Sequence, residues 1–195
     1  MNLAIDRLCI IDFEASSLPL PGQRSFPIEV AIGWIPDGSK PWDFHIREWL
    51  IAPEREWLKW TWDPAAQAIH GLSLEFLQHK GEPSGRVAQQ VLVTIGDRIL
   101  LSDAPDYEFR WLDTLLGYSD RPPKVGHLDL VLRSLAGTGP EGQERFLRAE
   151  LYAKEHAPIE HKASSDVRHQ LTRLAFIAAK GATPPAVGTG GGDAG

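Results

Sequence analysis

Cysteine is almost absent from this chain of 195 residues, in which Cys9 is the only example. A single cysteine cannot form an internal disulfide, so the fold must be held by its core alone, as is usual in a reducing compartment. We therefore expect a cytoplasmic protein. Cys9 lies among the apolar residues of "LCIIDF", and this position predicts a buried, unreactive thiol.

Long hydrophobic runs and an excess of positive charge are also missing. No apolar stretch approaches the roughly 18 residues that span a bilayer, and Asp6 and Arg7 interrupt the apolar start of the chain, which predicts a strand rather than a signal peptide. We expect no membrane partner. The net charge of -6 argues against broad, non-specific coating of nucleic acid. It is compatible with an acidic site that binds a phosphate substrate through divalent metal ions.

The order of the segments predicts an α/β fold. The length suits one domain, at residues 1–180, and the Gly- and Pro-rich residues 181–195 predict a disordered tail. The pattern β-β-β-α-β-α-β-α indicates a mixed five-stranded sheet flanked by helices. Strands are predicted at 3–16, 26–35, 42–52 and 98–103 and near 125, and helices at 63–70, 73–80, 84–95, 107–118, 140–156 and 163–179, with a further one after 128.

Two acids interrupt the apolar residues of the first predicted strand. Side chains at positions i and i+2 of a strand share a face, so Asp12 and Glu14 project side by side. Adjacent carboxylates form an oxygen-rich pocket that suits Mg²⁺ or Mn²⁺. The pattern alone is weak, because an Asp-x-Glu is expected roughly once by chance in this composition, and Asp106 with Glu108 forms a second one.

A histidine and an aspartate precede the last predicted helix, in "HKASSDVRHQL". His161 can remove a proton from water, and Asp166 can hold a metal ion that acidifies that water. This spacing is also expected about once in two chains of this composition, so by itself it indicates little. The pair is informative only together with Asp12 and Glu14, because the two motifs then lie on the first strand and before the final helix of one fold.

Taken in chain order, these features resemble the DEDDh family of 3'-5' exonucleases, which includes polymerase proofreading subunits and RNase T and has an RNase H-like fold. The resemblance covers about residues 7–179. Asp12 and Glu14 match its first motif, and His161 and Asp166 match its third. "FPIEVAIGWI" resembles the second strand of the family, with Glu29 in its usual place.

Further segments resemble the substrate-binding parts of that family. "ASSL" stands where the family has a turn against the terminal nucleotide, and "AIHGLS" looks like the family's IHGI(S/T) segment. The tryptophans of "EREWLKWTWDP" are candidates for stacking on bases. The residues expected to contact substrate are therefore Ala15, Ser16, Ser17, His70 and Trp62.

The second motif departs from the family pattern. The family reads F-D-x-x-F-L at the start of a helix, and the matching segment here is "YEFRWL", which places Glu108 where an Asp is expected. A Glu can ligate a divalent ion but reaches one methylene further. Glu108 is the favoured third acid, Asp103 is the next choice, and Asp106 is a further alternative.

The resemblance implies a reaction as well as a fold. It implies two divalent cations, Mg²⁺ or Mn²⁺, held by Asp12, Glu14, Glu108 and Asp166, with His161 as general base. The expected products are nucleoside 5'-monophosphates released from the 3' end of single-stranded RNA or DNA, and a homodimer is also implied. The unusual Glu108 leaves an alternative open, a catalytically weakened module that binds nucleic acid or a protein partner.

Overall fold

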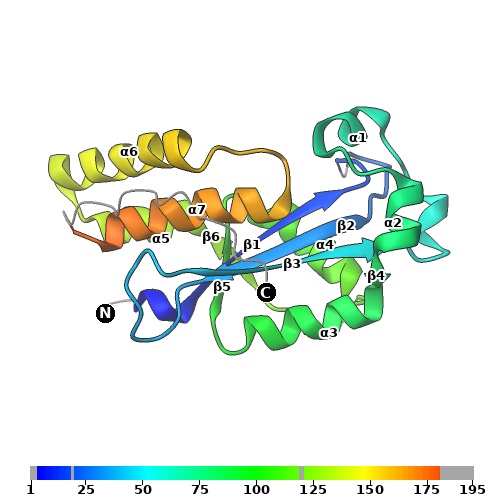
Figure 1. Ribbon diagram of the computed structural model, residues 1–195, viewed down its shortest axis with the longest axis horizontal. Coiled ribbons are helices and arrows are strands. Elements are labelled where there is room, and N and C mark those ends of the chain that lie inside the picture. Colours follow the sequence, from blue (N-terminus) through cyan, green and yellow to red (C-terminus); the bar gives the residue numbers. More distant parts are fainter. Residues whose placement is uncertain (1–3, 19, 119–120, 181–195) are drawn as a thin grey trace, which may run out of the picture.

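The computed structural model describes residues 4–18, 20–118 and 121–180, so the predicted tail at 181–195 lies outside the described residues. Its six strands form one mixed sheet in the order β4-β3-β2-β1-β5-β6 (Figure 1). The α/β fold predicted from the sequence is confirmed. The strands are β1 (Leu8–Ala15), β2 (Pro27–Trp34), β3 (His45–Ala52), β4 (Glu82–Pro83), β5 (Ile99–Ser102) and β6 (Val125–His127).

Strands β1, β2 and β3 form the predicted antiparallel meander, and β5 and β6 add to it in parallel. The sixth strand, β4, has two residues and pairs in parallel with the end of β3, at Ile51 and Ala52. Five strands are predicted from the sequence, because a two-residue strand is too short to show an alternating pattern.

Two strand boundaries differ from the prediction. Strand β1 begins at Leu8, because Ile5–Arg7 form a 3-10 turn (η1) in which the Arg7 N–H donates to the Ala4 carbonyl at 3.2 Å. Strand β3 begins at His45 rather than residue 42. Local turns at the strand ends, which hydropathy does not reveal, account for both differences.

Helices cover both faces of the sheet. Helices α5, α6 and α7 pack on one face, and α2, α3 and α4 pack on the other (Figure 1). None of the helices in the described residues has the length and hydropathy that crossing a bilayer requires. Their bounds are η2 (Trp57–Lys59), α1 (Pro64–His70), α2 (Leu74–Lys80), α3 (Ser84–Ile95), α4 (Pro105–Leu115), α5 (Leu128–Ala136), α6 (Gly139–His156) and α7 (Ala163–Ala178).

Strand β1 contributes to both cores because its side chains alternate between the two faces. Cys9 and Ile11 are buried with α3 and α4, whereas Leu8 and Ile10 are buried with α5 and α7. By the same alternation Asp12 belongs to the α7 face. Burial raises the pKa of the Cys9 thiol to about 12, so this cysteine stays protonated at neutral pH.

Helix α7 lies very close to strand β2 at Gly33. A methyl group added to Gly33 would come within 2.5 Å of side-chain carbons of both Val167 and Leu171. The missing side chain therefore allows the first turns of α7 to pack directly on the sheet. Asp166 immediately precedes Val167, so this contact also holds Asp166 next to the sheet.

Candidate functional site

Strand β1 extends beyond its parallel neighbour. Strand β5 pairs only with Leu8–Ile10, so the second half of β1 has no strand on that side. The chain leaves β5 at Ser102 and enters α4 at Pro105, which places the first turn of α4 beside this free edge. Crevices at the carboxyl ends of parallel strands commonly hold functional sites.

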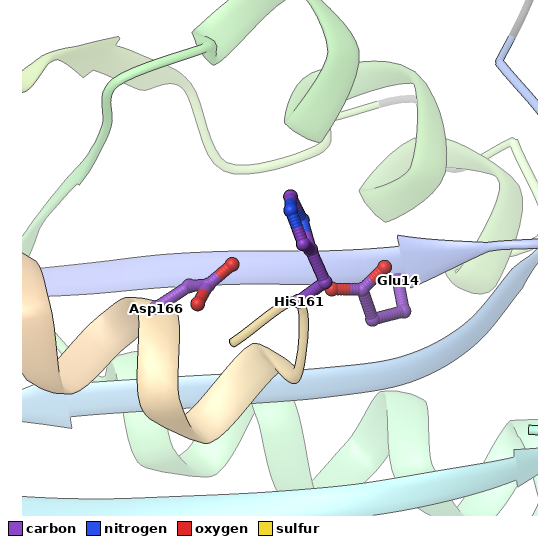
Figure 2. A group of neighbouring side chains, drawn as sticks. All are labelled: Glu14, His161 and Asp166. Atoms are coloured by element: carbon purple, nitrogen blue, oxygen red, sulfur yellow. The ribbon is translucent and has the colours of Figure 1, made fainter. Parts of the chain in front are cut away.

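Glu14, His161 and Asp166 meet at this end of the sheet, with one potential ligand atom from each within 4.8 Å of the others (Figure 2). His161 is exposed and has a left-handed backbone with φ +54°, which histidine adopts more readily than bulky or β-branched residues. The Asp166 carboxylate accepts hydrogen bonds from the Glu160 N–H at 3.1 Å and the Ser165 hydroxyl at 2.8 Å. These bonds orient Asp166 toward Glu14.

Glu108 and the half-buried Asp12 form the inner part of the same acidic cluster. Glu108, on the first turn of α4, is only 3% exposed. Burial, and then the negative charges of Asp103 and Glu14, raise the pKa of Glu108 well above its ordinary value, although a hydrogen bond from the Phe13 backbone opposes the shift. Burial, and then Glu108 and other acids, raise the pKa of Asp12 in the same way. One Glu108 oxygen, Oε2, is buried and has no hydrogen-bond partner among the described residues.

The two alternative acids of the second motif lie differently. Asp103 is exposed and accepts a hydrogen bond from the Gln170 amide at 2.8 Å. Asp106 is also exposed. Of the three acids considered, Glu108 is therefore the one buried against Asp12, which favours Glu108 as the third carboxylate of the cluster.

Glu29 on β2 is a further acid of the cluster, and it is not among the residues predicted to bind metal. It is the cross-strand partner of Glu14, and its Oε2 accepts the Ala163 N–H at 2.8 Å, which fixes the first residue of α7 to the sheet. Burial raises the pKa of Glu29 to about 7, and the Ala163 bond partly opposes this shift. An acid inside the buried segment "PIEVAIGW" is the signal that points to such a role.

The turn after β1 contains two serines with different surroundings, Ser16 and Ser17. The Ser16 hydroxyl accepts the Phe26 N–H at 3.0 Å, and the Ser16 N–H donates to the Phe26 carbonyl at 2.9 Å, so Ser16 closes the loop between β1 and β2. Ser17 is buried, and its hydroxyl has no partner among the described residues. Ala15 is buried at the end of β1. Of these three expected contacts, Ser17 offers the free polar side chain.

His70 also presents an unpaired group. The Leu72 N–H donates to its Nδ1 at 3.0 Å, which leaves the ring proton on Nε2, and Nε2 is buried without a partner among the described residues. Burial lowers the pKa of His70, so the neutral ring is favoured. Trp62 packs edge-on against this ring and donates its indole N–H to Gln67 at 2.9 Å. In the free protein Trp62 thus supports His70 and the core rather than presenting an open face.

The acidic cluster predicts that the metal-free protein loses stability as the pH rises. Burial, and then Asp166 and Glu29, raise the pKa of Glu14 to about 8, and the pKa of Glu29 is about 7, whereas both groups titrate near 4.5 when unperturbed. Between about pH 4.5 and 8 the folded chain therefore holds protons that the unfolded chain has released, and its stability falls. We expect the melting temperature in EDTA to drop by at least about 3 °C over this range, the shift that about 1 kcal/mol produces at this chain length.

The matched variant for this measurement is Glu14→Gln, which removes the carboxyl group whose pKa is raised to about 8. Its melting temperature should fall less than that of the wild type over the same pH range. Identical pH dependences of the two proteins would contradict the proposed protonation of Glu14.

Comparison with solved structures shows which folds this chain resembles. It matches the zinc-ion-bound form of an E. coli ExoI–ssDNA complex with a TM-score of 0.61 and 16% identity, over 89% of this chain. E. coli exonuclease I with a dA16 oligonucleotide gives 0.61 and 15% over 86%, and a structure of exonuclease I that addresses processivity gives 0.60 and 15% over 87%. At these identities the likeness establishes the shared fold.

The similarity covers only part of those proteins. The chain spans 40% of the length of each of the three exonuclease I chains. No protein-family model matches this sequence, and no curated protein sequence matches it. The DEDDh resemblance therefore stays a prediction, carried by the motifs and the shared fold.

Proposed function

We propose that this chain is a metal-dependent 3'-5' exonuclease that releases nucleoside 5'-monophosphates from single-stranded nucleic acid. One observation carries the proposal: Glu14 from β1 lies with His161 and Asp166 from the start of α7, within 4.8 Å, beside the half-buried Asp12 and the buried Glu108. Four carboxylates and a histidine from three distant segments converge at one sheet end. The similarity to E. coli exonuclease I, whose structures contain ssDNA or a dA16 oligonucleotide, supports the same substrate class.

The residues of the cluster fit a divalent metal centre. Asp12, Glu14, Glu108 and Asp166 offer oxygen donors, the buried Glu108 Oε2 has no partner among the described residues, and no Lys or Arg among them pairs with these four acids. We infer that these four acids hold two Mg²⁺ or Mn²⁺ ions. When bound, such ions lower the pKa of a coordinated water and stabilise charge on a leaving oxygen.

His161 acts as general base in this proposal. Its exposed imidazole lies beside Glu14 and Asp166, where a neutral ring nitrogen takes a proton from the attacking water. His161 is the most exposed of these groups, since Asp12, Glu14 and Asp166 are half-buried and Glu108 is buried. The base is thus held at the mouth of the site, and the acids lie behind it.

The terminal nucleotide is bound by the turn after β1 and by α1. The Ser17 hydroxyl and the His70 Nε2–H are buried donors without a protein partner among the described residues, and each suits a sugar or phosphate oxygen. The Asp63 N–H donates to the Ser16 carbonyl at 2.8 Å, which ties the start of α1 to this turn. Trp62 holds the His70 ring, and Ala15 and Ser16 supply the backbone of the turn.

A second candidate function follows from Glu108. Because Glu reaches one methylene further than the Asp of the family motif, the chain could be a catalytically weakened module that binds nucleic acid or a protein partner. We also propose a cytoplasmic location, since the buried Cys9 thiol suits a reducing compartment, and a homodimer as the family resemblance implies.

Trimming of a 5'-labelled oligonucleotide tests the proposal directly. We expect the wild type with Mn²⁺ to shorten the labelled strand one nucleotide at a time, and EDTA to stop the reaction. DNA and RNA of the same sequence, compared in parallel, identify the preferred substrate. A chain that binds the oligonucleotide without shortening it under any metal condition would support the weakened module instead.

The same assay identifies the third acid. Glu108→Gln should lower kcat on the order of 10²-fold, because it removes a buried ligand and keeps the side-chain volume. Asp103→Asn, the matched variant at the exposed acid, should lower kcat by less than about tenfold. The reverse ranking of the two variants would reassign the ligand to Asp103.

A further inference from the structure

A groove runs between residues 20–25 and helix α4, outside the acidic cluster. Three adjoining hollows of about 580, 230 and 340 Å³ form it, and Gln23 lines all three. The largest lies beside Tyr107 and Arg110 at the start of α4, and the other two extend toward Trp60. We refer to these hollows together as the Arg24–Arg110 groove.

The walls of the groove are fixed by hydrogen bonds. The indole N–H of buried Trp111 on α4 donates to the Ser25 hydroxyl at 3.0 Å. The Thr61 N–H donates to the Arg24 carbonyl at 2.9 Å, so the segment after η2 supports the loop from the other side. A preformed groove of this kind binds a flexible chain at a smaller entropic cost than a mobile loop does.

The groove combines positive charge with aromatic surface. The Arg24 guanidinium lies 3.9 Å above the Trp60 ring centroid and donates to the Tyr118 hydroxyl at 2.8 Å. Within the described residues, neither Arg24 nor Arg110 forms an ion pair with a carboxylate. The exposed Tyr107 ring stacks on Trp111 with centroids 6.0 Å apart.

The groove is less acidic than the chain as a whole. Three cationic and two acidic side chains line the hollows, and Lys59 pairs with Glu56 at 2.7 Å, so the charges nearly balance there, whereas the whole chain has a net charge of -6. A polyanion therefore meets less repulsion at the groove than over the average surface of the chain. The lining charges are Arg24, Lys59, Asp106, Arg110 and Asp113.

The groove and the candidate site share helix α4 and the loop that follows β1. Glu108 belongs to the acidic cluster, and Tyr107 and Arg110 of the same turns of α4 line the groove. The groove loop starts and ends at the Ser16–Phe26 hydrogen bonds, two residues beyond Glu14. A strand whose 3' end lies at the acids therefore reaches the groove within a few nucleotides.

We propose that the Arg24–Arg110 groove binds the nucleotides of a single strand that precede the 3'-terminal one. This inference rests on the proposed function. Arg24 and Arg110 contact phosphates, and the aromatic rings provide stacking surface for bases, which is the combination used for sequence-tolerant single-strand binding. The groove makes a long strand a better ligand than a short one.

Binding measured without hydrolysis tests this proposal separately from the reaction. The host is the full chain with Asp12→Asn, and fluorescence anisotropy gives the Kd of a 5'-labelled 12-mer and of a trimer. Adding Arg24→Gln and Arg110→Gln should shrink the advantage of the 12-mer about tenfold, the order expected for lost stacking and phosphate contacts. The slope of log K against log salt should become shallower by about 1.4, or about 0.7 for each lost contact.

Two further variants keep this test decisive. Arg110→Gln alone disturbs no hydrogen bond or ion pair of the described structure, so it should give about half of the change in slope even if loss of the Arg24–Tyr118 bond destabilises the double variant. Arg148→Gln, on the distant helix α6, removes the same charge and should leave the 12-mer advantage intact.

Each outcome has a separate meaning. An unchanged length advantage and salt slope in both groove variants, with normal trimming by the wild type, would overturn the groove and leave the proposed function standing. A wild type that trims nothing would overturn the proposed function, while the binding ratios still decide the groove. Equal losses in Arg148→Gln and Arg110→Gln would show a general charge effect and overturn the groove as well.

Discussion

Replacing Asp12 with asparagine should abolish trimming and leave the metal-free protein at least as stable as the wild type. Asp12 lies among Glu108, Asp166 and Glu14, and its pKa is raised well above the ordinary value by burial first and then by these charges. Without metal, a neutral side chain of the same shape therefore costs the fold little. With metal, the loss of a ligand should lower kcat on the order of 10³-fold or more.

A melting-temperature measurement and a control variant check the Asp12→Asn result. In Mn²⁺ the melting temperature of the wild type should rise, because the ion binds the folded state, and that of the variant should rise much less. Asp37→Asn, in an exposed turn between β2 and β3, serves as the control for loss of one acid. Wild-type trimming by Asp12→Asn would refute a role for this cluster in hydrolysis.

Replacing His161 with asparagine should lower kcat by about 10²- to 10⁴-fold, the range for loss of a general base. Asparagine is chosen because it tolerates the left-handed backbone found at this position, so a loss of rate reflects the missing imidazole rather than strain. The acids remain in place, and the melting temperature should still rise in Mn²⁺. KM for a short oligonucleotide should change little.

The contrast between His161→Asn and Asp166→Asn separates chemistry from metal binding. Asp166→Asn should lose both the rate and the metal-dependent rise in melting temperature. His79→Asn, at an exposed histidine of α2, is the control and should match the wild type. If His161→Asn lost the metal response to the same extent as Asp166→Asn, His161 would be a ligand rather than the base.

Parts of this fold that depend on local pattern could be predicted from the sequence. The alternation in "LCIIDFE" places Asp12 and Glu14 on one face of a strand, and the capping residues Asp63 and Ser73 mark the starts of α1 and α2, as the structure has them. The α/β order could be predicted from such segments. The strand β4 could not be predicted, because two residues are too few to show an alternating pattern.

Features that depend on distant contacts could not be predicted. The Glu29–Ala163 hydrogen bond joins residues 134 positions apart, and the Arg24–Tyr118 bond joins residues 94 positions apart. The residues around each partner do not indicate which distant residue it will contact. The segment "YEFRWL" already favours Glu108 over Asp103, but the burial of Glu108 beside Asp12 is not visible there, because it depends on where β1 extends beyond β5. The catalytic roles themselves remain predictions for the variants to test.

The close packing of α7 on Gly33 has a consequence for how the proposed site forms during folding. The sheet draws on residues 8–127 and the third-motif residues come after residue 160, so the acids of β1 meet Asp166 only when the last helix docks against β2. Contacts of such long sequence separation slow folding, because closing the intervening loop costs entropy. A chain in which the last helix has not docked therefore lacks the third-motif residues of the proposed site.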